Sequence, residues 1–361
     1  MSWRDLDESD VRVRASRKNS RPRTKDRPAH DDALVAMVIG VDRGRYTCLL
    51  PAGALGKKER ERVVTAMKAR EIGRTRIVVG DEVAIVGDVA GGPDALARIV
   101  RIEERRSVLR RTADDTDPYE RIIVANADQL VIVTALADPE PRPRMVDRCL
   151  VAAYDAGMTP LLALTKSDLV DPAEFLANYA PLEVAHVVTS RVEGDFTGLE
   201  ALRDQLAGKI SVFVGHSGVG KSTLVNGLVP GAGRATGIVN DTTGRGRHTS
   251  SSAVALRLPD ADGKHAGDGW VIDTPGVRSF GLAHIDVDRI IDNFPDLAEG
   301  AENCPRGCSH DEPECALDAW VADGHAGSAG PSRLESLRRL LGSRGTAEER
   351  DDRENREDRG R

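Results

Sequence analysis

The sequence predicts a multidomain protein in which an all-β barrel precedes an α/β phosphate-loop domain and a small helical module follows it. Short β-branched runs fill residues 33–112, apolar runs alternate with helical segments over 113–284, and three cysteines and a histidine cluster within 285–335. We expect a basic arm over 1–32 to be disordered, because it cannot bury enough apolar surface to offset its ordering entropy. A charged tail covers 336–361.

The composition limits the classes of protein to which the chain can belong. Its 361 residues accommodate two or three domains, and its net charge of −7 excludes a polycation. Five cysteines, three of them packed close together, favour a metal site in a reducing compartment over a disulfide framework. No secretory signal is visible, and the apolar runs are far shorter than the roughly 20 residues of a membrane span. We therefore predict a cytoplasmic protein with no membrane association.

The basic arm is the one strongly cationic part of the chain. Arginines and lysines dominate from Arg12 to Arg27. A cluster of this kind is typical of a segment that seeks phosphate groups. A solubilising tail is the alternative interpretation.

The first folded region has the pattern of a small β-barrel. Glycines and aspartates separate short runs rich in β-branched residues, as expected for strands and turns. Five strands within about 70 residues suit an oligonucleotide-binding (OB-like) barrel, although other small barrels also fit. Basic residues near 57–62 and 101–111 favour a nucleic-acid partner, with a solvated charged face as the alternative. The expected strands are Ala33–Val41, Tyr46–Leu50, Arg76–Val79, Glu82–Val86 and Ala97–Ile102.

The central region alternates apolar strands with helices. Because its strands are apolar throughout, we predict a parallel sheet that helices cover on both faces. The expected strands include Leu130–Ala135, Leu161–Leu164, Ala185–Thr189 and Ile210–Val214, and the expected helices are Arg144–Ala156, Pro172–Asn178, Leu199–Leu206 and Ser222–Leu228.

A phosphate loop lies between the strand Ile210–Val214 and the following helix. Its residues match G-x-x-x-x-G-K-[ST] completely, and its glycines let backbone N–H groups turn inward around phosphates. We expect Lys221 to bridge the β- and γ-phosphates and Ser222 to hold Mg²⁺. The residues are Gly215, His216, Ser217, Gly218, Val219, Gly220, Lys221, Ser222 and Thr223.

A second motif, D-x-x-G, follows the apolar run Trp270–Ile272. Asp273 ends this run, where a carboxylate can supply the second protein contact to Mg²⁺. Gly276 can then offer its N–H group to the γ-phosphate at close approach.

Guanine selectivity is predicted from the tetrapeptide Thr165, Lys166, Ser167 and Asp168, which follows a strand. In the T-K-x-D arrangement the aspartate accepts from guanine N1–H and the 2-amino group, and the lysine stem lies over the base. Adenine lacks donors on that edge and would leave the carboxylate unpaired, so ATP is rejected. Ser190, with its neighbour Thr189, is the expected partner loop near the guanine carbonyl.

The order of these motifs is permuted. Familiar small GTPases run from the phosphate loop through D-x-x-G to the base loop, whereas here the base loops come first. The same sheet forms if the old termini are joined and new ones opened, because domain termini tend to lie close together. We therefore predict a circularly permuted GTPase domain. The switch after Gly276 then runs directly into the C-terminal module, which should move with or sense the nucleotide state.

The hydrolytic residues are less clearly marked. Val277 stands where many GTPases carry a water-orienting glutamine, so slow intrinsic hydrolysis is expected. Thr249 is the predicted switch contact to Mg²⁺ and the γ-phosphate. His248 is a candidate to orient water or act as a general base, with an ordinary loop histidine as the alternative. Arg245 and Arg247 could equally contact RNA phosphate.

Cys304, Cys308, His310 and Cys315 provide three thiolates and one imidazole within twelve residues. This is a complete tetrahedral Cys₃His set, so we predict one structural zinc ion whose binding is coupled to folding. A redox pair or unrelated buried cysteines are the alternatives, and Asp311 or water could replace the histidine.

These motifs together closely resemble the ribosome small-subunit-dependent GTPase A family. The likeness covers roughly residues 33–330 and includes the segments 79–83 and 125–129 beside the motifs above. The resemblance implies a late-acting maturation factor of the small ribosomal subunit that hydrolyses GTP to GDP with stimulation by that subunit. It also implies that His248 is the catalytic switch histidine. The first and last metal-ligand intervals are each one residue shorter than the family's usual ones.

Three hypotheses follow for the function. The first is a GTPase assembly factor that binds the small subunit and its rRNA, and that we expect to be monomeric when free. The second is a non-enzymatic RNA-binding protein whose conformation GTP sets. The third is a permuted GTPase that acts on the large subunit or another RNA. Subunit-dependent turnover and co-sedimentation with separated subunits distinguish them.

Overall fold

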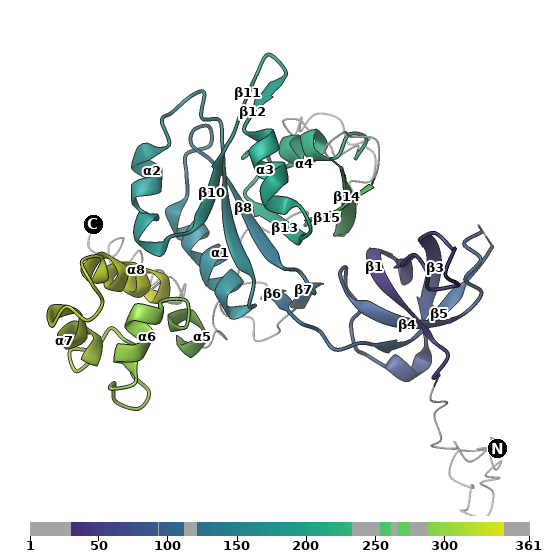
Figure 1. Cartoon of the computed structure of the whole chain (residues 1–361), viewed down its shortest axis with the longest axis horizontal. Coiled ribbons are helices and arrows are strands. Elements are labelled where there is room, and N and C mark those ends of the chain that lie inside the picture. Colours follow the sequence, from purple (N-terminus) through teal and green to yellow (C-terminus); the bar gives the residue numbers. More distant parts are fainter. Residues whose placement is uncertain are drawn as a thin grey trace, which may run out of the picture. The chain divides into compact units, whose positions relative to one another are not determined.

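The computed structural model of the chain describes residues 30–92, 94–111, 121–232, 253–260, 266–274 and 287–342 (Figure 1). Residues 33–361 form one compact unit and residues 1–32 another. The basic residues of the arm, from Arg12 to Arg27, lie outside the described residues. So do His248, Thr249 and Gly276.

Five strands form the expected barrel. Antiparallel pairing follows the order β1-β2-β3, β3 pairs in parallel with β5, and β5 pairs with β4. The additional β1–β4 pairing closes the barrel. Val38, Cys48 and Ile99 are fully buried inside it. The strands are β1 (Leu34–Asp42), β2 (Arg45–Leu50), β3 (Arg62–Lys68), β4 (Glu82–Gly87) and β5 (Ala97–Ile102).

One expected barrel strand is wrong. Arg76–Val79 is no strand, and Val79 makes only an isolated bridge to Val124. The N–H group of Val78 donates to the Asp81 carboxylate at 2.8 Å, so a side chain satisfies this backbone instead of a neighbouring strand. The fifth strand of the barrel is instead β3, which the sequence analysis did not predict.

The central sheet has five parallel strands and one antiparallel strand. The order is β10-β9-β8-β13-β15-β14, with β14 antiparallel to β15. At its other edge β14 pairs with β1 of the barrel, where Gly40 lies opposite Val254. The strands are β8 (Gln129–Ala135), β9 (Thr159–Thr165), β10 (Ala185–Val188), β13 (Ile210–Gly215), β14 (Val254–Pro259) and β15 (Ala266–Asp273).

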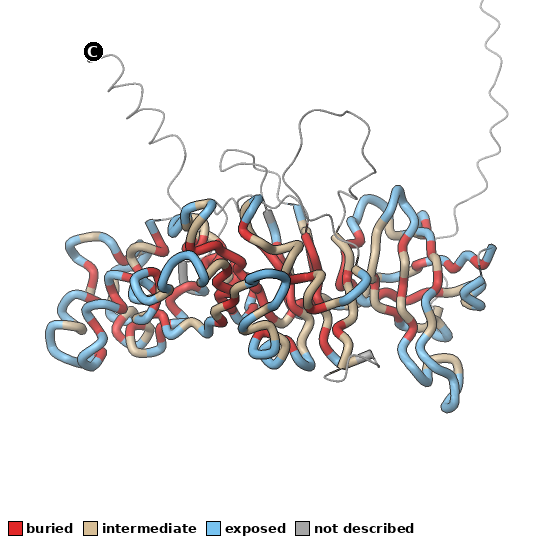
Figure 2. The backbone as a smooth tube through the Cα atoms, turned by 90° about the horizontal axis from the view of Figure 1, so that it is seen from above, coloured by how far each residue is buried: buried red, intermediate tan, exposed pale blue. Residues whose placement is uncertain are grey.

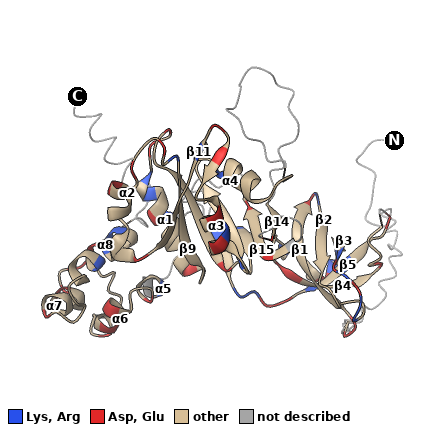
Figure 3. Ribbon diagram, turned by 45° about the horizontal axis from the view of Figure 1, so that its top comes forward, with Lys and Arg blue, Asp and Glu red and all other residues tan. Residues whose placement is uncertain are grey.

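Helices cover both faces of this sheet, as predicted. Alternate residues of β8 enter different cores: Leu130 and Ile132 join the cluster that includes α1, and Val131 and Val133 join the cluster that includes α3 and α4. Figure 3 shows charged residues on helices such as α3, whereas β9 carries none. The helices are α1 (Pro143–Asp155), α2 (Ala173–Ala177), α3 (Leu199–Leu206) and α4 (Lys221–Leu228), with a 3₁₀ turn, η3, at Ala180–Leu182.

Two short hairpins were not predicted. One pairs β6 (Val108–Arg111) with β7 (Arg121–Ala125), between the barrel and the central sheet in the chain. The other pairs β11 (Ser190–Val192) with β12 (Asp195–Thr197), so Ser190 of the expected Thr189-Ser190 loop is the first residue of a strand.

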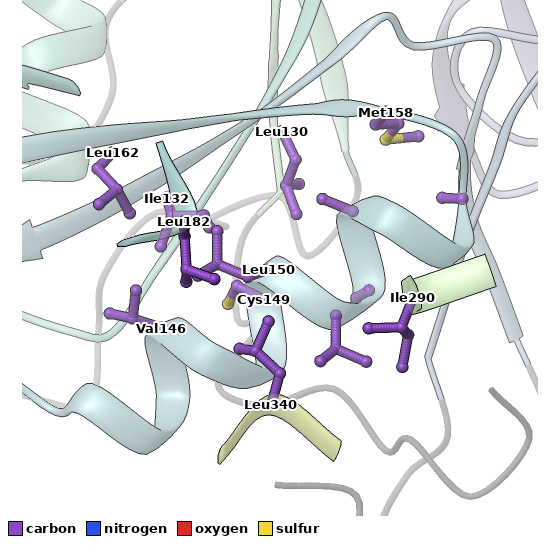
Figure 4. Packing of buried hydrophobic residues seen from close by; sticks show 14 of the residues in the cluster. Leu130, Ile132, Val146, Cys149, Leu150, Met158, Leu162, Leu182, Ile290 and Leu340 are labelled. Atoms are coloured by element: carbon purple, nitrogen blue, oxygen red, sulfur yellow. The ribbon is translucent and has the colours of Figure 1, made fainter. Parts of the chain in front are cut away.

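The C-terminal module packs on the same core as α1. In Figure 4, Leu340 and Ile290 lie against one side of α1, and Leu130 and Leu162 of strands β8 and β9 lie on the other side. Residues of β8 and α1 belong to one buried cluster, and Figure 2 shows buried residues inside the molecule with exposed ones mainly in its loops. In the part of the chain that the structure describes, every helix is too short or too polar to span a bilayer. The module's helices are α5 (Val287–Ile291), α6 (Pro295–Ala301), α7 (Ala316–Ala322) and α8 (Gly330–Gly342), and α8 crosses the expected boundary at 335.

Candidate nucleotide and metal sites

The phosphate loop joins β13 to α4. Gly218 and Gly220 have φ values of 85° and 89°, which glycine adopts without strain. A Cβ atom on Gly215 would lie 2.7 Å from the Val133 carbonyl oxygen, so the loop passes close to β8. The backbone therefore favours glycine at three positions of this loop, of which the sequence pattern specifies Gly215 and Gly220. His216 contacts the Ser217 carbonyl, and Val219 is the buried residue of the loop's centre, 4% exposed.

Two opposite charges meet beside this loop. The Lys221 ammonium group pairs with the Asp273 carboxylate, and only 5% of the aspartate side chain is exposed. Asp273 ends β15, which lies next to β13 in the sheet. The neighbouring Thr274 hydroxyl donates to the Phe213 carbonyl at 2.8 Å and holds this segment against β13. Ser222 and Thr223 are half-buried in the first turn of α4.

The base loop follows β9 and is fixed by backbone contacts. Lys166 has a φ of 60°, and its ammonium group donates to the Asp138 carbonyl. The Ser167 N–H group and hydroxyl both lie 3.3 Å from the Thr189 carbonyl oxygen, which joins the two expected base loops. Asp168 is exposed, so its carboxylate is accessible.

The base loop and the phosphate loop line one cavity of about 360 Å³. This is within the usual size range of small-molecule sites. The Thr165 hydroxyl donates to the Val219 carbonyl at 2.6 Å, a buried hydrogen bond that ties the two loops directly together. The lining residues are Asp138, Thr165, Lys166, Asp168, Leu169, Thr189, Ser190, Arg191, Phe196, Gly220, Thr223 and Leu224.

The cavity includes residues that the sequence analysis did not select. Asp138 follows β8, and Arg191 and Phe196 belong to the β11–β12 hairpin, where the Arg191 guanidinium lies 5.3 Å from the Phe196 ring centre. A hairpin of three-residue strands leaves no clear periodic signal in the sequence. Asp138 could have been suspected, because it follows the strand that lies between β9 and β13.

The four expected metal ligands meet between α6 and α7. Their donor atoms all lie within 4.8 Å of one another. Cys304 Sγ lies 3.6 Å from His310 Nδ1 and 3.8 Å from Cys315 Sγ, and the His310–Cys315 distance is 3.8 Å. Thiolates bound tetrahedrally at about 2.3 Å stand about 3.8 Å apart, so the arrangement of Cys304, Cys308, His310 and Cys315 fits a tetrahedral metal ion.

Neighbouring polar groups orient this cluster. The Glu312 carboxylate accepts from the Ser309 N–H group at 2.9 Å and from the Cys308 thiol. Arg338, on α8, donates to the His310 carbonyl at 2.8 Å and pairs with Asp318. The ligand loop is thereby attached to the helix that packs against α1.

Comparisons with known proteins agree with this arrangement. The model of the family described as RsgA GTPase matches residues 102–283. A small ribosomal subunit biogenesis GTPase RsgA from Ectopseudomonas mendocina is 42% identical over 229 residues, which span 61% of this chain and 63% of the relative's length. The protein of the same name from Chlorobaculum parvum is 36% identical over 80% of this chain and 92% of its own.

Two solved structures share the fold. The crystal structure of YjeQ from Thermotoga maritima has a TM-score of 0.59 and 25% identity, and the match covers 86% of this chain and 98% of that one. The crystal structure of YloQ, described as a circularly permuted GTPase, has a TM-score of 0.56 and 21% identity, and covers 87% and 98%. The fold is thus the predicted barrel, permuted phosphate-loop domain and Cys₃His module, and the chain belongs to the RsgA GTPase family.

Proposed function

We propose that this protein hydrolyses GTP to GDP and phosphate while bound to the small ribosomal subunit, and that it acts late in the maturation of that subunit. The observation that carries this proposal is the shared cavity, in which Asp168 of the base loop and Gly220 of the phosphate loop are both lining residues. The names of the relatives, small ribosomal subunit biogenesis GTPase RsgA, supply the subunit as the partner.

In this proposal the base loop selects guanine. Asp168 accepts from the two donors on the guanine edge, and the Lys166 stem covers the base. Thr165 and Ser190 also line the cavity, and Ser167 is proposed to complete the base loop through its contact with the Thr189 carbonyl. The exposure of the Asp168 carboxylate supports this role, because the group is available to an entering base.

The phosphate loop binds the triphosphate through its backbone, and Lys221 neutralises the β- and γ-phosphates. Ser222, Asp273 and Thr249 are the proposed Mg²⁺ ligands, and oxygen donors of this kind suit a hard cation. The bound ion would neutralise charge on the phosphates. His248 is proposed to orient the attacking water, and Gly276 to contact the γ-phosphate.

The Cys₃His cluster is proposed to hold one structural Zn²⁺ ion. Three thiolates and one imidazole leave no position open for a substrate, which favours a structural site over a catalytic one. The hydrogen bond from Arg338 to the His310 carbonyl would then anchor α8 to a metal-stabilised loop.

The barrel is the proposed contact to rRNA. Lys57, Lys58 and Arg60 are exposed in the segment between β2 and β3, where phosphate groups can reach them. We further propose that the protein works in the cytoplasm and is a monomer when free.

Turnover of GTP with and without purified small subunits tests the proposal. We expect slow turnover by the protein alone and an increase of at least about tenfold with small subunits, because catalytic groups supplied by a partner raise GTP hydrolysis by roughly 10³–10⁵. Lys221→Ala should abolish turnover under both conditions. Large subunits serve as the matched control and should not stimulate.

Equal rates with and without small subunits would refute the assembly role. Stimulation by large subunits alone would assign the protein to the other particle. Co-sedimentation of the protein with each subunit, in the presence of a non-hydrolysable GTP analogue, gives an independent readout of the partner.

A further inference from the structure

Two sequence segments that the nucleotide site does not use meet at one place in the structure. Residues 79–83 precede and enter β4 of the barrel, and residues 125–129 lead from β7 into β8 of the central sheet. The Ala125 N–H group donates to the Val79 carbonyl at 3.1 Å. A Cβ atom on Gly80 would lie only 1.9 Å from the Ala125 carbonyl oxygen, so the two segments touch backbone to backbone. We call this contact, with residues 105–107, the joint.

A fully buried carboxylate fixes the barrel side of the joint. Asp81 is 0% exposed and accepts from Arg105 at 2.6 Å and 2.9 Å, and from the Val78 N–H group at 2.8 Å. Arg105 lies on the linker that leaves β5, and its side chain is only 16% exposed. The linker is therefore attached to the barrel by a buried, bidentate ion pair.

Asn126 fixes the other side of the joint. It is 2% exposed and has a φ of 56°, a conformation that asparagine tolerates better than most residues. Its side-chain oxygen accepts from the Arg106 N–H group at 2.8 Å, and its side-chain nitrogen donates to the Gly80 carbonyl at 2.9 Å. One side chain thus binds both the linker and the barrel.

The joint continues into the strand that carries the phosphate loop. Arg106 pairs with Asp128 at 3.0 Å. The other carboxylate oxygen of Asp128 accepts from the Ile210 N–H group at 2.8 Å, and Ile210 is the first residue of β13. Because β13 ends at Gly215, where the phosphate loop begins, a continuous set of hydrogen bonds and one strand connect the barrel to that loop.

A flexible linker would absorb movements of the barrel, whereas a network that is buried at Asp81 and Asn126 can pass them on to the central sheet. We propose that Asp81, Arg105 and Asn126 are positioning residues that couple binding of the small subunit at the barrel to the geometry of the phosphate loop. This inference rests on the proposed function, and it names the side chains through which binding of the small subunit stimulates GTP turnover. None of the three lines the nucleotide cavity.

Two variants weaken the joint from its two sides. Asp81→Asn removes the negative charge, and Asn126→Gly keeps the positive φ accessible while it removes both side-chain hydrogen bonds. The matched control is Glu103→Gln on the same linker, which removes an exposed ion pair with Arg101 of β5. Each protein is assayed for basal GTP turnover, GDP affinity, co-sedimentation with small subunits and stimulated turnover.

We expect both joint variants to keep basal turnover, GDP affinity and subunit binding within about twofold of wild type. Stimulated turnover should fall by about tenfold or more, within the 5- to 150-fold range typical of coupling between sites. The double variant should be no worse than the more affected single variant, because both changes interrupt the same connection. Glu103→Gln should behave as wild type.

Wild-type stimulation in a folded joint variant would overturn the inference. Equal loss of basal and stimulated turnover would also overturn it, because the joint would then only stabilise the domain. Loss of subunit binding in the joint variants would also contradict the inference, because the joint would then be needed to bind the small subunit and not to couple that binding to the phosphate loop. If one variant fails to fold, the other decides. A wild-type protein that small subunits do not stimulate would refute the proposed function itself and this inference with it.

Discussion

The hydrogen bond from Thr165 to Val219 gives a sharp test of how the two loops of the cavity cooperate. Its donor lies in the base loop and its acceptor in the phosphate loop, 2.6 Å apart and buried. Thr165→Val keeps the size of the side chain and removes only the hydroxyl donor. The Val219 carbonyl, on a residue that is 4% exposed, then has no partner from the base loop.

The size of the effect follows from this burial. A buried acceptor left without a donor costs about 1–3 kcal/mol. If that cost falls on the conformation that binds nucleotide, GDP affinity drops about 5- to 150-fold, because 1.4 kcal/mol corresponds to roughly a factor of ten. Isothermal titration calorimetry with GDP measures this change, and urea denaturation measures the loss of stability alongside it.

Two controls separate positioning from general destabilisation. Thr165→Ser retains the hydroxyl and should bind GDP nearly as wild type does. Ser107→Ala removes another buried 2.6 Å bond, from the serine hydroxyl to the Ala127 carbonyl, away from the cavity. It should lower stability and leave GDP affinity unchanged. If Thr165→Val binds GDP as tightly as Ser107→Ala does, the bond between the loops has no role in forming the site.

Further predictions concern the C-terminal module and its contact with α1. Metal analysis should find one zinc ion per chain. Because metal binding is coupled to folding, removal of the ion by a chelator should unfold the ligand loop and change the fluorescence of Trp320 on α7. Unchanged fluorescence after complete removal of the metal would contradict this prediction. Burial raises the pKa of the Asp147 carboxyl, although Arg339 and Tyr179 oppose the shift. Because the pKa of Asp147 is higher in the folded than in the unfolded state, protonation of this carboxyl stabilises the fold. This stabilisation is fully present at a pH below the ordinary aspartate pKa, and it is lost as the pH rises through the raised pKa of the folded state. Asp147→Asn cannot ionise, so its free energy of unfolding should increase relative to wild type over that window, and a pH-independent difference in urea denaturation would refute this assignment.

Much of the central fold could be predicted because its hydrophobic pattern and glycines are local signals. The helix expected at Leu199–Leu206 is α3 with the same bounds, and the strand expected at Ile210–Val214 is β13 with one more residue. The phosphate loop could be recognised because its backbone conformation requires glycines at particular positions, and few sequences have them there. The roles of individual loop residues stay predictions, and His248, Thr249 and Gly276 lie outside the described residues.

Features that depend on distant partners could not be predicted in this way. Strand β3 carries arginine, threonine and lysine, so its burial on one face emerges only from pairing with β2 and β5. The sequence analysis counted Arg105 among basic residues that favour a nucleic-acid partner. In the structure its guanidinium group pairs with the buried Asp81. Only the fold brings these two residues together, since 24 positions separate them in the chain.

The base preference of Asp168→Asn is the most direct test that these two loops form one guanine site. An asparagine offers a donor where the carboxylate only accepts, and xanthine has an oxygen where guanine has its amino group. The affinities of wild type and variant for GDP and XDP should be measured by titration calorimetry under the same conditions. We expect the wild type to prefer GDP and the variant to prefer XDP. An unchanged preference for GDP would show that the base is bound elsewhere.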